Sequence, residues 1–147
     1  MKKLAILIVV VAMIAGIAYM KYSFEKPSVT IKAAQTLVEV TEGTYCWSSL
    51  TSSACVDKIS PPEIIRAEKI APTIVKPGAT LQYSFNRTPL KDSTALSLWM
   101  NEDNEEKNVA LNNNTFQAPK ESGIYVYNLS ANWDRGDVNY VFAIQVE

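Results

Sequence analysis

The sequence predicts an all-β fold, an immunoglobulin-like antiparallel β-sandwich behind an N-terminal transmembrane or signal helix. Three observations support this prediction: a charge-free apolar run at the N-terminus, period-two alternation of apolar residues further on, and turn-forming residues between the alternating segments. The chain of 147 residues divides into residues 1–26, a signal or transmembrane anchor with a short linker, and residues 27–147, one extracytoplasmic β-sandwich domain.

The N-terminal segment begins with Lys2 and Lys3 and continues as an apolar run from Leu4 to Met20. Its 17 residues are at the short end of what a membrane-spanning helix needs. We expect residues 4–20 to anchor the protein in the cell membrane as a single pass, with the two lysines holding the N-terminus inside. The C-terminal domain then lies outside the cytoplasm.

A cleaved signal is the alternative to an anchor. A cleavage after Ala18 would have the small residues Gly16 and Ala18 at its −3 and −1 positions, which favours removal. The apolar run continues beyond that point through Tyr19 and Met20, which favours an uncleaved anchor. A cleaved protein would be secreted.

Alternation of apolar residues predicts the strands. The residues expected in the core are Leu81, Tyr83, Phe85, Leu96, Leu98, Tyr125, Tyr127, Tyr140, Phe142 and Ile144. Met100, Leu129, Ala131, Trp133 and Val146 share the faces of these residues. About seven short β segments in a domain of this length are typical of an immunoglobulin-like sandwich. A small closed barrel is the competing fold, but two long segments meeting at one tight hairpin near Gly136 favour the sandwich.

The proline-containing stretch between residues 59 and 75 has no clear alternation. Ile64, Ile65, Ile70 and Ile74 are expected in short edge segments there, because Pro61, Pro62 and Pro72 are excluded from central strands. No helical period of useful length follows residue 26, so we expect hardly any helix in the domain.

A resemblance rests on the segment Gly43-Thr44-Tyr45-Cys46-Trp47, then Cys55, Lys76-Pro77-Gly78 and Phe116-x-Ala118-Pro119-Lys120-x-x-Gly123-x-Tyr125-x-Tyr127. The chain resembles small exported proteins of Gram-positive bacteria, membrane-anchored or lipoprotein-like, with an immunoglobulin-like domain and uncharacterised function. The likeness spans most of residues 43–147, and its first piece is the most distinctive. This chain departs from it in having no lipid-attachment cysteine after the apolar run. The resemblance implies location and fold, and no catalytic residue.

Cys46 and Cys55 are nine positions apart, and a disulfide is the default for such a pair in an oxidising compartment. Closing a loop of this length stabilises the fold by roughly 2.5–3 kcal/mol in the chain-entropy model. A redox or metal role is the alternative, but redox pairs are usually closer, and zinc would need carboxylate ligands here.

Histidine is absent from the sequence. This excludes catalytic triads of the usual form, two-histidine metal sites and histidine general bases. Asp134 and Asp137 flank one turn, and residues 102–106 place acidic side chains on another, where turn formation by itself explains Asp and Asn. We therefore expect no catalytic residue, no metal and no cofactor.

The charge balance of the domain argues against a nucleic-acid partner. The chain has 15 acidic and 14 basic residues, and four of the lysines lie in residues 1–26, so the domain is net negative. A nucleic-acid partner is not expected, because it would need a basic surface.

The candidate binding residues are Trp47, Trp99, Trp133, Asp134 and Asp137. Trp133 ends a core-facing series beside the hairpin, Trp47 adjoins the cysteine pair, and alternation places Trp99 on the face opposite the core. Aromatic side chains at strand ends can stack on sugars or peptides. Core packing is the alternative interpretation, favoured for Trp47 and Trp133 and open for Trp99.

Two function classes remain open. The preferred hypothesis is a membrane-tethered interaction module, with no catalysis, that binds an envelope protein, peptide or glycan. The alternative is a redox or hydrolytic accessory enzyme of the envelope that uses Cys46 and Cys55 or the turn carboxylates.

Overall fold

The computed structural model describes residues 2–100 and 105–147. The elements in that range are α1 (Lys2–Phe24), β1 (Val29–Ala33), β2 (Thr36–Val38), β3 (Val40–Ser48), β4 (Ser53–Val56), α2 (Pro61–Glu68), β5 (Thr73–Val75), β6 (Thr80–Phe85), β7 (Ala95–Met100), β8 (Glu105–Val109), β9 (Thr115–Gln117), β10 (Gly123–Trp133) and β11 (Gly136–Val146). The chain is therefore mostly β, as predicted.

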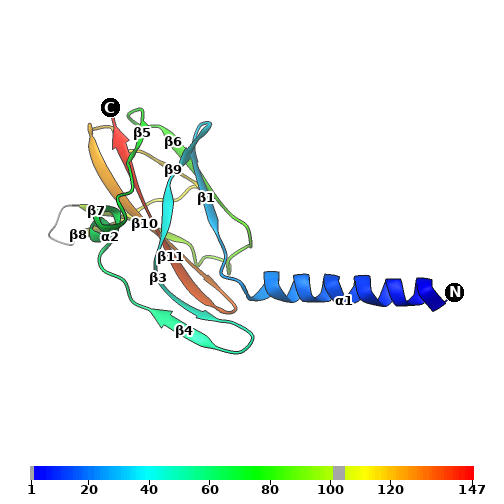
Figure 1. Cartoon of the computed structure of the whole chain (residues 1–147). Coiled ribbons are helices and arrows are strands. Elements are labelled where there is room, and N and C mark those ends of the chain that lie inside the picture. Colours follow the sequence, from blue (N-terminus) through cyan, green and yellow to red (C-terminus); the bar gives the residue numbers. More distant parts are fainter. Residues whose placement is uncertain (1, 101–104) are drawn as a thin grey trace.

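The strands form two sheets that face each other (Figure 1). The smaller sheet has the order β2-β1-β6-β9, and the larger has the order β4-β3-β11-β10-β7-β8. In the larger sheet β5 also pairs with the last residues of β11, and this pairing is parallel, whereas the other named pairs are antiparallel. The sandwich architecture predicted from the sequence is confirmed, with this one parallel pair as a correction.

The longest pairing is the hairpin of β10 and β11, which runs from Gly123↔Val146 to Trp133↔Gly136. Gly136 has a φ of 143°, in a region that side-chain-bearing residues rarely adopt. A Cβ at this position would lie 1.9 Å from the carbonyl oxygen of Cys46, so only glycine lets β3 approach the hairpin. The tight hairpin predicted near Gly136 is confirmed.

The main core lies between the sheets and contains most of the residues predicted for it. Tyr127 is 1% exposed and Phe142 is fully buried, and their rings stack with centroids 5.2 Å apart. The other predicted core residues in this buried cluster are Leu81, Tyr83, Leu96, Leu98, Tyr140 and Ile144. Their face neighbours Leu129, Ala131, Trp133 and Val146 are buried with them. Phe85 and Tyr125 are partly buried against it.

The domain contains one short helix, α2, where hardly any helix was expected, and Ile64 and Ile65 lie in it rather than in edge segments. Pro61 and Pro62 occupy the first positions of this helix, where a missing N–H has no consequence. Ser60 donates from its backbone N–H and its hydroxyl to Glu63 Oε2, at 3.0 and 2.6 Å. These hydrogen bonds lower the pKa of the Glu63 carboxyl and cap the helix.

The edge-segment prediction is right only for Ile74, which lies in β5 and is 60% exposed. Ile70 follows α2 and is buried with Ile64 and Ile65. Together with Val141 and Ala143 of β11 they form a second buried cluster on the outer face of the larger sheet. The face of β11 opposite the main core is therefore buried as well.

The α1 helix stands clear of the β domain (Figure 1). Its apolar side chains are exposed, as shown by Ile6 at 64% and Ile14 at 62%. Among the residues that the structure describes, no helix reaches the combined length and apolarity of a membrane span.

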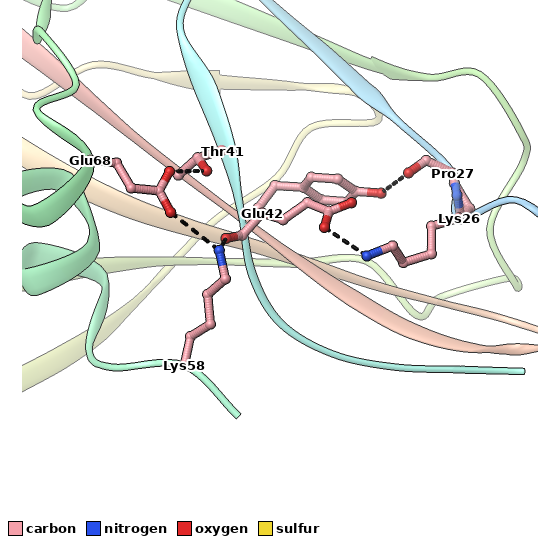
Figure 2. A network of polar contacts seen from close by, with 7 residues as sticks. Lys26, Pro27, Thr41, Glu42, Lys58 and Glu68 are labelled. Carbon is pink, nitrogen blue, oxygen red and sulfur yellow. Dashed lines mark hydrogen bonds and ion pairs between the residues drawn. The ribbon is translucent and has the colours of Figure 1, made fainter. Parts of the chain in front are cut away.

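The segment after α1 is bonded to the sandwich. The Tyr140 hydroxyl donates to the carbonyl of Pro27 at 2.6 Å in a buried position, and burial raises the pKa of this phenol. Lys26 Nζ forms an ion pair with Glu42 Oε2 (Figure 2), with the two atoms 2.7 Å apart, and lies 3.3 Å from the centroid of the Tyr45 ring. The domain end of the linker is thus held against β3 and β11.

A second group of polar contacts joins β3 to α2 (Figure 2). Glu68 accepts hydrogen bonds from Thr41 Oγ1 and, at 3.2 Å, from Lys58 Nζ, which also donates to the carbonyl of Glu42 at 2.6 Å. The bond from Thr41 lowers the pKa of the Glu68 carboxyl. Exposed contacts of this kind add little stability, so the burial of Ile64 and Ile65 is the main attachment of α2.

We expect Phe142→Ala to lower the free energy of unfolding by about 3–5 kcal/mol, because it opens a cavity at the centre of the core. Urea unfolding of the full chain in detergent, followed by near-ultraviolet circular dichroism, measures the change. Ile124→Ala is the matched control on the neighbouring strand; Ile124 is 63% exposed, and its change should stay within about 0.5 kcal/mol. Equal losses in the two variants would contradict the position of the core.

Candidate functional site

The end of the sandwich nearest α1 carries an open pocket of about 310 Å³, here called the basal pocket. Its lining residues are Trp47, Arg87, Thr88, Leu90, Trp133, Asp134 and Arg135. They come from β3, from the end of β10 with its hairpin turn, and from the segment between β6 and β7. The fold therefore brings three of the five candidate residues, Trp47, Trp133 and Asp134, into one pocket.

Trp47 and Trp133 form the aromatic wall. They are 6% and 8% exposed, and their rings meet edge-on with centroids 6.2 Å apart. Trp47 Nε1 donates to the carbonyl of Phe24 at 2.9 Å, and Trp133 Nε1 donates to the carbonyl of Arg87 at 3.1 Å. Both indoles are thus packed in the core with their N–H groups bonded, as the alternative interpretation held.

Charged groups of both signs surround this wall. The Arg87 guanidinium lies 5.5 Å from the Trp47 ring centroid, and that of Arg135 lies 3.8 Å from the ring centroid of Phe24, the last residue of α1. Asp134 is exposed at the same rim. Such a pocket can hold a ligand that combines an apolar group with polar or oppositely charged ones.

The other two candidate residues lie elsewhere. Asp137 pairs with Cys46 in the ladder of β11 and β3 and does not line the basal pocket. Trp99 is half-buried, outside the main core cluster, and lines a second, smaller pocket beside Ile64 of α2. This position agrees with the alternation, which places Trp99 on the face opposite the core.

The predicted disulfide between Cys46 and Cys55 is confirmed, with Cα atoms 4.0 Å apart. The two cysteines are directly opposite each other in the pairing of β3 with β4. The bridge therefore fastens an edge strand and closes the Ser- and Thr-rich loop that the sequence places between them. No group of three or more potential metal ligands occurs among the described residues. Glu102 and Asp103 of the acidic turn lie outside them.

Sequence reasoning missed Arg87, Thr88 and Leu90, because the segment between β6 and β7 has no alternation. The structure places this segment beside β10 through a hydrogen bond from Leu90 N to the carbonyl of Asn132, 2.8 Å long. A bond between residues so distant in sequence leaves no local pattern.

No protein-family model matches this chain, and no curated protein and no solved structure matches it. The geometry of the chain alone therefore carries the functional argument.

We expect Trp47→Ala and Trp133→Ala to lower the free energy of unfolding by about 3–5 kcal/mol each, because both rings are buried. Trp99→Ala, at a half-buried ring, should lower it by roughly 1 kcal/mol. Chemical unfolding of the three variants measures these differences. A Trp47 or Trp133 variant as stable as the wild type would show that its ring is not part of the core.

Proposed function

We propose that this protein is a membrane-tethered extracytoplasmic interaction module, without a reaction of its own, that binds a protein, peptide or glycan of the cell envelope. The observation that carries the proposal is the basal pocket, where two tryptophans, two arginines and Asp134 surround one opening. Aromatic and arginine side chains at a pocket are the groups that most often anchor a binding partner.

The tether in this proposal is α1. Its charge-free run from Leu4 to Met20 is about 26 Å long as a helix, close to the roughly 30 Å of a bilayer core. The exposed apolar side chains of α1 gain free energy when lipid replaces water around them. Lys2 and Lys3 precede the run and favour an inside N-terminus.

The position of the basal pocket limits what can reach it. Trp47 bonds to the carbonyl of Phe24 and Arg135 lies over its ring, so the pocket adjoins the end of α1. With α1 in the membrane, the pocket opens close to the lipid surface. Its partner is then a molecule of the membrane surface or the adjacent envelope.

The immunoglobulin-like class of the sandwich belongs to the same proposal. It is supported by the two facing, mainly antiparallel sheets and by the aromatic core between them.

Alkaline extraction of cell membranes tests the tether. We expect the full-length protein to stay in the membrane pellet with residues 1–26 present in its intact mass. Ile14→Lys should release it, because a lysine at the centre of a spanning helix costs about 2.5–3.5 kcal/mol of insertion. Leu37→Lys, at an exposed leucine of β2, is the control that should stay bound. A wild-type protein released in a form that begins at Tyr19 would contradict the tether.

Capture from envelope extracts tests the pocket. The full chain, immobilised in detergent through its C-terminus, should lose its partner by at least about tenfold when Leu90→Arg fills the basal pocket. Leu90 is 45% exposed, so the melting temperature should hardly change. Leu37→Arg is the matched control at a distant exposed leucine. Equal capture by all three proteins would contradict binding through this pocket.

A further inference from the structure

A second pocket, of about 170 Å³, lies on the outer face of the larger sheet next to the start of α2; it is here called the outer pocket. Trp99 of β7 and Asn128 of β10 line it together with Ile64 of α2 and Val141 of β11, two apolar side chains that are almost fully buried. Lys58 also lines it. A single water needs only about 10–15 Å³ of such volume, so the pocket is larger than one water requires.

Two buried polar atoms of this pocket's lining residues have no hydrogen-bond partner within the described part of the chain. They are Nε1 of Trp99, a donor, and Oδ1 of Asn128, an acceptor. The indole N–H groups of Trp47 and Trp133 are both bonded to backbone carbonyls, so Trp99 is the exception among the tryptophans. Unpartnered buried polar groups are rare in folded proteins, since they destabilise the native state.

Among the described residues that line the outer pocket, Lys58 is the charged one, and its charge is paired. Lys58 Nζ already donates to Glu68 and to the carbonyl of Glu42. A ligand that suits the pocket is therefore neutral, with one acceptor for Trp99, one donor for Asn128, and an apolar end for Ile64 and Val141.

We propose that the outer pocket binds the acetamido group of an N-acetylated amino sugar. The acetamido carbonyl oxygen accepts from Trp99 Nε1–H, the amide N–H donates to Asn128 Oδ1, and the methyl group packs against Ile64 and Val141. A lone hydroxyl would leave the apolar wall unused. A peptide-backbone amide has chain on both sides and no terminal methyl, and a glutamine carboxamide ends in a polar group.

Entry of this group requires a movement. Trp99 Nε1 and Asn128 Oδ1 are both covered, so binding as proposed requires the half-buried Trp99 ring to turn away from them. The inference does not depend on the basal pocket or on the tether, because it rests on different residues.

The indole N–H signals of tryptophan test the inference in the full chain. The protein is labelled with ¹⁵N-tryptophan in detergent micelles, Trp99→Phe assigns its signal among the three, and N-acetylglucosamine is added. We expect the Trp99 signal alone to shift. The shift should saturate with a Kd of about 1 mM, which corresponds to a binding free energy of about −4 kcal/mol. The Trp47 and Trp133 signals are internal controls and should stay in place.

Asn128→Leu should weaken N-acetylglucosamine binding by at least about tenfold, with an unchanged or higher Tm, because it removes an unpartnered acceptor. Asn132→Leu is the matched control, an exposed asparagine on the same strand, and should bind as the wild type does. Glucose, which has a hydroxyl in place of the acetamido group, should leave the Trp99 signal in place.

Four results would overturn the proposal. They are no saturable movement of the Trp99 signal, an equal movement with glucose, a larger movement with a glutamine-containing peptide, and a lower Tm for Asn128→Leu. A larger shift with the peptide would mean that the pocket binds a protein partner. A lower Tm for Asn128→Leu would mean that Asn128 Oδ1 stabilises the fold through a bound water. These four results do not depend on whether the basal pocket captures a partner, so the two proposals can fail separately.

Discussion

The burial of β11 on both of its faces is the constraint on which the rest of the structure depends. Along its length this strand pairs with β10, with β3 and then with β5. One face places Phe142 and Ile144 in the main core, and the other places Val141 and Ala143 under α2. Two sheets and one helix are thereby held to a single strand, so both pockets are built on elements that pack against it.

The two pockets use tryptophan in different ways. At the basal pocket the indole N–H groups of Trp47 and Trp133 are bonded to backbone carbonyls, so these residues contribute shape and rigidity, and the neighbouring charged groups contribute polarity. At the outer pocket the N–H of Trp99 remains unbonded within the described residues. Under the two proposals, a tryptophan N–H contacts the ligand directly at the outer pocket, whereas the shape and charge of the basal pocket select its partner.

The local sequence pattern explains why the long strands were predicted correctly and why α2 was not predicted. Alternation identified β6, β7, β10 and β11, because their core faces repeat every second residue. It did not identify α2, because Pro61 and Pro62 also indicate a break between strands. The sequence Ser60-Pro61-Pro62-Glu63 carries the signal of a helix start, with proline at the first positions and a glutamate that caps Ser60.

The sequence by itself determined the β-sandwich class, the core residues of the long strands and the pairing of Cys46 with Cys55, because periodicity and cysteine spacing are local or depend on few residues. Only the tertiary structure decided that Val141 is covered by α2, that Leu90 lies beside the hairpin, and that Trp99 Nε1 and Asn128 Oδ1 have no hydrogen-bond partner among the described residues. These arrangements depend on contacts between segments far apart in the chain, whose free energies leave no periodic pattern in the residues that make them.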